Sequence, residues 1–107
     1  MMAPSYRLLV EPAAYAERKR LPGDVRQLAR EWIVQLALEP RPDFSEALDT
    51  RGLDTPPDVE LRRIRFKQWR LIYAVNDVAG WVWIWGLRKR PPYNYDDLAS
   101  FADTIEN

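Results

Sequence analysis

The fold is decided by residues 59–76, which read VELRRIRFKQWRLIYAVN. Two runs within it, 59–66 and 69–76, are rich in the β-branched and aromatic side chains that suit a pleated strand. Only two residues separate these runs, which is too short a link for a helical crossover, so we expect an antiparallel hairpin. A third run, 81–88, extends the hairpin to a three-strand meander, after residues with turn chemistry at Asn76, Asp77 and Gly80.

The residues before the meander predict a strand and two helices. A short strand over 6–10 leads to Pro12, whose fixed φ suits a helix start, and we expect a helix over 13–21. Asp24 then serves as the N-cap of a second helix, which ends before Pro40. Because the two helices form an antiparallel hairpin, the apolar stripe of the second must cover another surface. That stripe has helical spacing: Val25, Leu28, Ala29, Trp32, Ile33, Leu36 and Ala37.

Two segments flank the meander. Residues 41–58 are rich in Pro, Asp, Thr and Gly, and we expect a long connection, of a length that is usually functional, mobile or ordered by a partner. Beyond the meander, Asp96 and Asp97 are possible helix caps. Apolar residues follow them at helical spacing and predict a short C-terminal helix: Leu98, Phe101, Ala102 and Ile105.

Length and composition limit the classes of protein. The chain has 107 residues, of which 47% are hydrophobic and 30% charged, so we expect one domain spanning 1–107. It contains no Cys and no His, which excludes disulfides and removes the usual general base and the commonest metal ligand. We therefore expect no metal and no cofactor, and a location in the cytoplasm. No signal-peptide core or long apolar run is present, so we expect no contact with a membrane.

A net charge of zero hides a strongly basic region at residues 61–95. This region has one acidic residue, Asp77, against eight basic ones: Arg62, Arg63, Arg65, Lys67, Arg70, Arg88, Lys89 and Arg90. Acidic residues are in excess in the rest of the chain and balance the sum. Since a local basic patch is enough to attract a polyanion, we expect RNA to be the partner of these strands.

Alternation of side chains along each strand separates the two faces of the meander. We assign Leu71, Tyr73 and Val75 to the face under the helical hairpin, and Trp83, Trp85 and Leu87 with them. The opposite face then holds four arginines, whose guanidinium groups can bind phosphate through bidentate hydrogen bonds. They are Arg63, Arg65, Arg70 and Arg88. The same face carries Ile72, Ala74, Val82 and Ile84, so we expect the C-terminal segment or a partner to cover part of it.

Structural explanations exist for the same residues. Basic side chains on strands often form only a solvated face or protect a sheet edge from pairing. Alternating Trp81, Trp83 and Trp85 are more typical of a core than of a binding ladder. Trp69 stands at a hairpin shoulder between basic residues, where it can stack on a base or pack against the fold.

The order of elements resembles the RelE/ParE superfamily of toxins from type II toxin–antitoxin systems, in its RelE-like branch. Residues 61–73 and the later Gly-Leu-Arg-Lys-Arg at 86–90 carry the resemblance, which spans roughly residues 6–98. It implies an α+β fold with an N-terminal strand and an antiparallel helical hairpin packed on a curved antiparallel sheet. The sheet ends in the three-strand meander, and a short C-terminal helix can follow.

The resemblance also implies a function, a metal-independent endoribonuclease that cleaves mRNA in the ribosome and inhibits translation. Implied partners are a cognate antitoxin, the ribosome and mRNA, with a higher-order toxin–antitoxin complex. Two alternatives stay open, a ParE-like inhibitor of DNA gyrase and a catalytically inactive antitoxin-binding module. The implied catalytic residues are Arg63, Arg65, Arg70, Arg88 and Tyr93, with Tyr95 as the other candidate for the family's terminal tyrosine. The implied RNA-binding residues are Lys67, Trp69, Lys89, Arg90 and Tyr95.

Overall fold

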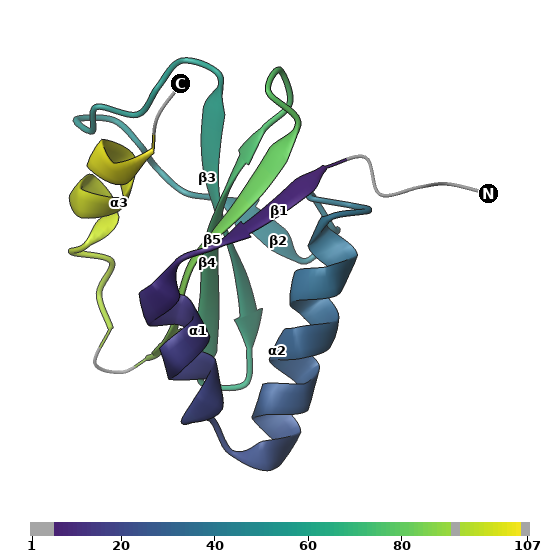
Figure 1. Ribbon diagram of the computed structural model, residues 1–107. Coiled ribbons are helices and arrows are strands. Elements are labelled where there is room, and N and C mark those ends of the chain that lie inside the picture. The colour runs from purple at the N-terminus through teal and green to yellow at the C-terminus, as the bar shows by residue number, and fades with distance from the viewer. Residues whose placement is uncertain (1–5, 91–92, 106–107) are drawn as a thin grey trace.

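The computed structural model describes residues 6–90 and 93–105. Residues 1–5, where the search for a signal peptide began, lie outside these ranges. Figure 1 shows one open sheet, with two helices of the N-terminal half on one side and a short C-terminal helix apart from them. The elements are β1 (Arg7–Val10), α1 (Pro12–Lys19), α2 (Gly23–Leu36), β2 (Ser45–Ala47), β3 (Val59–Phe66), β4 (Trp69–Asn76), β5 (Trp81–Lys89) and α3 (Leu98–Thr104).

The five strands form one sheet in the order β1-β5-β4-β3-β2. The predicted meander β3-β4-β5 is confirmed, with Phe66 paired to Trp69 across the two-residue turn. Gly80 closes the second turn with φ +74°, in the left-handed region that glycine adopts without strain. The α+β fold class is confirmed, although β1 runs parallel to β5 and so departs from the antiparallel pairing that we expected.

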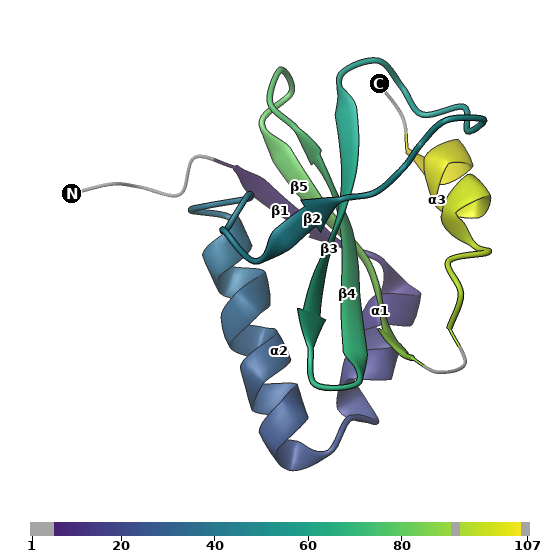
Figure 2. The ribbon, with the colours of Figure 1, turned by 180° about the vertical axis from the view of Figure 1, so that it is seen from behind.

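The two faces of the sheet are covered by different helices. The face under α1 and α2 holds a buried cluster that includes Ile64, Leu71, Tyr73, Val82 and Leu87. The other face packs against α3, and in the view from behind in Figure 2 this helix stands beside the sheet, well away from α2. Phe101 of α3 is fully buried there and stacks on Trp85, with ring centroids 4.6 Å apart. The C-terminal segment therefore covers part of the arginine-bearing face, as expected.

Our assignment of faces along β5 was wrong for its first half. Val82 and Ile84 lie in the cluster under α1 and α2, whereas Trp83 and Trp85 pack in the cluster under α3. The cause is a β-bulge, because Ile72 pairs with Gly86 while Tyr73 pairs with Ile84, which leaves an extra residue in β5. The simple alternation that we applied assumes that no such residue intervenes.

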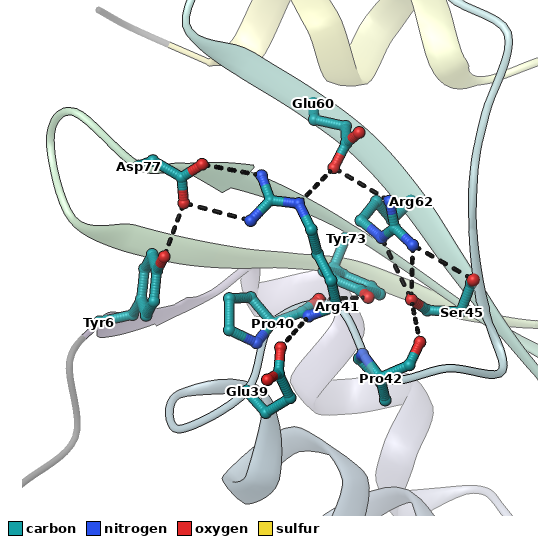
Figure 3. Close-up of polar contacts among 10 residues, drawn as sticks. All are labelled: Tyr6, Glu39, Pro40, Arg41, Pro42, Ser45, Glu60, Arg62, Tyr73 and Asp77. Atoms are coloured by element: carbon teal, nitrogen blue, oxygen red, sulfur yellow. Dashed lines mark hydrogen bonds and ion pairs between the residues drawn. The ribbon is translucent and has the colours of Figure 1, made fainter. Parts of the chain in front are cut away.

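The long connection at 41–58 was also read incompletely, since it contains the edge strand β2, antiparallel to β3. A polar network fixes its start to the sheet (Figure 3). The Arg41 guanidinium lies 2.9 Å from both Glu60 and Asp77, and Asp77 accepts a further hydrogen bond from the Tyr6 hydroxyl at 2.6 Å. These contacts tie the segment before β2 to β3 and to the turn after β4.

A buried hydroxyl adds a further contact beside this network: Tyr73 of β4 donates a hydrogen bond of 2.7 Å to the carbonyl of Pro40. Arg62 donates to the Ser45 Oγ at 2.7 Å and thereby holds the first residue of β2 (Figure 3). Burial raises the pKa of Tyr73 above its ordinary value, so its proton stays available for the bond. The proline stop after α2 is thus anchored by side chains from the meander.

The helix ends differ slightly from our expectation. α1 begins at Pro12 itself, and the N-cap position of α2 is Pro22, with no side-chain capping bond. Asp24 lies in the first turn of α2 instead of capping it, and its carboxylate accepts a hydrogen bond of 2.7 Å from Lys67. An acidic residue there still favours the helix because it faces the positive end of the helix dipole. No helix in the described part of the chain is long and apolar enough to cross a membrane.

Candidate functional site

Three arginines stand side by side across the three meander strands. Arg65 of β3 pairs with Arg70 of β4, and Arg70 pairs with Arg88 of β5. Arg63 lies two residues before Arg65 and therefore on the same face. Like charges directly opposite one another destabilise a sheet, so folding alone does not favour this row. An anion held between the guanidinium groups would remove the repulsion.

Arg70 is the buried member of the row, with 9% of its surface exposed. Its Nη1 donates to the carbonyl of Trp69 at 2.9 Å, and its Nε has no hydrogen-bond partner in the part of the chain that the structure describes. Within residues 6–90 and 93–105, no carboxylate lies within 4 Å of its guanidinium. A buried charge without a counter-ion is costly, and this is the position in the row most in need of an external anion.

Arg88 is held from two sides. Its guanidinium contacts the carboxylate of Glu17 on α1, and its Nη2 lies 3.1 Å from Asp97, which directly precedes α3. The same guanidinium lies over the backbone of Gly86, where a Cβ would come within 2.0 Å of its Nη1. Because Gly86 has no side chain, it leaves the space that the Arg88 guanidinium occupies between Glu17 and Asp97.

Gly86→Ala is expected to displace Arg88 while leaving it in the chain. Because the clash involves the flexible end of a side chain, Arg88 can swing away and the fold should survive. We expect any activity that depends on Arg88 to fall about tenfold or more, with a change of under about 1 kcal/mol in the free energy of unfolding. Activity assays beside denaturant titrations check this, and Gly23→Ala is the matched control, since its Cβ would meet no atom within 4 Å. Equal activity of both variants would contradict the proposed clamp.

Arg65 is the member of the row nearest to β2, and Arg63 borders the row on that side. Arg63 donates to the Tyr95 hydroxyl at 2.8 Å and pairs with Glu46 of β2 at 3.1 Å. Arg65 is more exposed and lies 3.9 Å from the same carboxylate. Tyr95 has φ +66°, an uncommon backbone conformation for an aromatic residue, and this brings its ring beside Arg63 and Arg90. An edge strand that sequence reasoning missed therefore supplies the counter-charge.

Tyr93 lies next to Arg88, whose guanidinium carbon is 5.8 Å from the centre of the ring. Its hydroxyl donates a hydrogen bond of 2.6 Å to Asp97. Burial, and then the hydrogen bond to the Asp97 carboxylate, raise the pKa of Tyr93 far above its ordinary value. Tyr93 therefore keeps its proton at neutral pH and is unsuited to act as a base, and its single hydroxyl hydrogen is directed at Asp97.

The raised pKa of Tyr93 predicts a loss of stability at alkaline pH. Above pH about 10 the unfolded chain releases this proton while the folded chain keeps it, so the free energy of unfolding must fall as the pH rises. Denaturant titrations from about pH 8 to about pH 11 should show a steeper fall for the wild-type chain than for Tyr93→Phe. Identical pH profiles for the two proteins would show that Asp97 does not hold the Tyr93 hydroxyl.

The remaining predicted RNA contacts lie around the turn of the β3–β4 hairpin, at the last residue of β5 and directly after it. Lys67 sits in the turn with φ +55° and pairs with Asp24 of α2. Trp69 packs on the core yet stays partly exposed, which confirms packing against the fold, while stacking on a base stays a prediction. It lines a cleft of about 270 Å³ that adjoins the row. The cleft is bordered by Glu17, Arg20, Leu21, Trp69, Leu87, Arg88 and Lys89. Lys89 and Arg90 are exposed.

Sequence reasoning missed the carboxylates that surround the arginines, Glu17, Glu46 and Asp97. Asp97 was noted only as a possible helix cap, and it forms no side-chain capping bond. Nothing in local sequence distinguishes Glu17 or Glu46 from other exposed acidic residues, because Arg88 lies 71 residues beyond Glu17. In the ranges that the structure describes, no group of three or more acidic, His or Cys side chains could hold a metal ion.

Solved structures of other proteins resemble this chain, whereas comparisons of its sequence find no match. No protein-family model and no curated protein matches the sequence. Solved structures do match, among them a chain of the archaeal RelE–RelB complex from Pyrococcus horikoshii, with 25% identity and a TM-score of 0.68 over 83% of this chain and 99% of that one. The chain is similar to RelE toxins in its fold.

Two further structures agree with the RelE-like assignment. A variant of Escherichia coli RelE in the free state shares 25% identity and has a TM-score of 0.61, covering 92% of this chain and 95% of that chain. A chain of the intact Escherichia coli RelBE toxin–antitoxin complex shares 26% identity with a TM-score of 0.55, over 78% and 95% of the two chains. The resemblance seen in the sequence of the meander is thus confirmed at the level of the fold.

Proposed function

We propose that the chain is a RelE-like toxin, a metal-independent endoribonuclease that cleaves mRNA on the ribosome and so inhibits translation. The observation that carries the proposal is the cross-strand row of Arg65, Arg70 and Arg88. A row of like charges with a buried and unpaired member is suited to an anion as dense as an RNA phosphate. Arg63 and Tyr93 lie at the margins of the row and extend the site, so that it can follow the sugar–phosphate backbone of a single-stranded RNA.

The reaction that suits these groups is attack by a ribose 2′-hydroxyl on the adjacent phosphorus. The hydroxyl proton passes to a base, the bond to the 5′ oxygen breaks, and that oxygen takes up a proton. The products are a 2′,3′-cyclic phosphate and a 5′-hydroxyl end. Arg70 and Arg88 stabilise the additional negative charge on the phosphorane. The Tyr93 hydroxyl donates its hydrogen to Asp97 and presents its oxygen as a hydrogen-bond acceptor to the 2′-hydroxyl.

Partners follow from the same assignment. The similar structures include complexes of RelE with RelB, and we propose that a cognate antitoxin neutralises this chain in the cytoplasm. Toxin and antitoxin would then assemble into a higher-order complex, with residues 1–107 as a single toxin domain. The gene next to this one should encode a small protein whose acidic segment complements the basic face.

The test is inducible expression of the chain followed by mapping of transcript 5′ ends. New ends at fixed positions within codons, which vanish when translation initiation is blocked, are the expected result. Growth arrest with intact transcripts and an induced DNA-damage response would replace the nuclease with a ParE-like inhibitor of gyrase. Absence of any growth defect would instead favour an inactive module that only binds an antitoxin.

A further inference from the structure

A single carboxylate, that of Asp97, joins the arginine row to the C-terminal helix. Its Oδ2 accepts hydrogen bonds from the Trp85 Nε1 at 2.9 Å and the Arg88 Nη2 at 3.1 Å. Its Oδ1 accepts a third from the Tyr93 hydroxyl at 2.6 Å. The three donors come from β5 and from the segment before α3, so one side chain connects two separate parts of the chain.

The Asp97 carboxylate is charged at neutral pH. Burial by itself would raise the pKa of Asp97, but the hydrogen bonds from Tyr93 and Trp85 and the charge of Arg88 outweigh it. The net result is a pKa below the ordinary value. A charged acceptor makes shorter and stronger hydrogen bonds than a neutral one, so it restricts both Arg88 and Tyr93 effectively.

Within the described residues, Asp97 is the side chain that contacts both Arg88 and Tyr93 through hydrogen bonds. Arg88 is long and flexible, and Glu17 restrains its guanidinium only from the side of α1. Asp97 restrains it from the opposite side and fixes the distance to the tyrosine. Removing either restraint would leave the charge near the site but spread over many rotamers.

We infer that Asp97 is a positioning residue that sets Arg88 and Tyr93 against the reacting phosphate. The inference rests on the proposed endoribonuclease function and deepens it. Asp97 does not touch the RNA itself, and its effect reaches the reaction through the two side chains that it orients. Because Asp97 directly precedes α3, whose Phe101 stacks on Trp85, the site is complete only when α3 is docked on the sheet.

The decisive comparison is Asp97→Asn against Asp96→Asn, on the full chain. Asp96 is the neighbouring residue and is exposed, and among the described residues its side chain enters no hydrogen bond or ion pair. Under single-turnover conditions with programmed ribosomes, Asp97→Asn should lower the maximal cleavage rate about tenfold to a hundredfold. The ribosome concentration for half-maximal rate should stay within about twofold, since the charges that bind RNA remain. Asp96→Asn should resemble the wild-type protein in both values.

A second measurement separates positioning from general structural damage. Alkaline titration of tyrosine absorbance should show one more ionising tyrosine between pH about 10 and about 12 in Asp97→Asn than in the wild-type protein. The extra tyrosine should disappear in the double variant with Tyr93→Phe. Adding Asp97→Asn to Arg88→Ala should reduce the rate little further, because both changes remove the same interaction.

The possible results distinguish the role of Asp97 from the endoribonuclease function. A wild-type chain that cleaves RNA, beside an Asp97→Asn variant with the same rate and the same tyrosine titration, overturns the role of Asp97 alone. A rate loss that merely follows the loss of folded protein, measured by circular dichroism at the assay temperature, also overturns it. No cleavage by the wild-type chain overturns the endoribonuclease function, while the titration still reports whether Asp97 holds Tyr93.

Discussion

Arg88→Ala is expected to lower the rate of mRNA cleavage by about a hundredfold to a thousandfold, which is typical for loss of one preorganised donor to a charged transition state. The fold should persist, because Arg88 is partly exposed and its ion pairs with Glu17 and Asp97 are screened by solvent. Cleavage of programmed ribosomes by purified protein measures the loss. Arg88→Lys keeps the charge but not the bidentate geometry, so its cleavage rate should lie between those of the wild-type protein and Arg88→Ala.

Arg70→Ala sharpens this prediction because activity and stability should move in opposite directions. Cleavage should fall by a similar factor, whereas the free energy of unfolding should stay equal or rise, since the substitution removes a buried and unpaired charge. Arg26→Ala, at an exposed position of α2, controls for a general loss of positive charge. If both Arg70→Ala and Arg88→Ala cleave at the wild-type rate, the row is not the active surface.

Phe101→Ala should produce the largest loss of stability. Phe101 is fully buried under α3 and stacks on Trp85 at 4.6 Å, so truncation leaves a cavity between helix and sheet. We expect a cost of about 3 kcal/mol in the free energy of unfolding and a fall of roughly 12–24 °C in Tm. Thermal unfolding followed by circular dichroism checks the value.

Ser100→Ala is the matched control for Phe101→Ala, because Ser100 is the neighbouring exposed residue of α3 and its loss should change Tm little. Tryptophan fluorescence adds a local readout, since undocking of α3 exposes Trp85 to water. A Tm within a few degrees of the wild type, with an unchanged emission maximum, would mean that α3 does not depend on Phe101 for docking.

Much of the architecture was predictable because its signals are local. The two-residue link between β3 and β4 fixes their register, and this alone brings Arg65 opposite Arg70. The helical hairpin followed from apolar spacing and prolines, and the C-terminal helix from the spacing of Leu98 and Phe101. The edge strand β2 was missed because three residues are too few to show an alternating pattern.

The sequence by itself determined which residues form the basic face, since strand parity and tight turns act between neighbours in the chain. Only the tertiary structure decided what surrounds that face. A bulge between the pairs of Ile72 and Tyr73 turned the tryptophans of β5 toward α3. Packing brought Glu17 and Asp97 to Arg88 from opposite sides, over sequence separations that no local pattern encodes. Charge and alternation are properties of a strand, whereas the partner of a charge is set by the helices that pack against it.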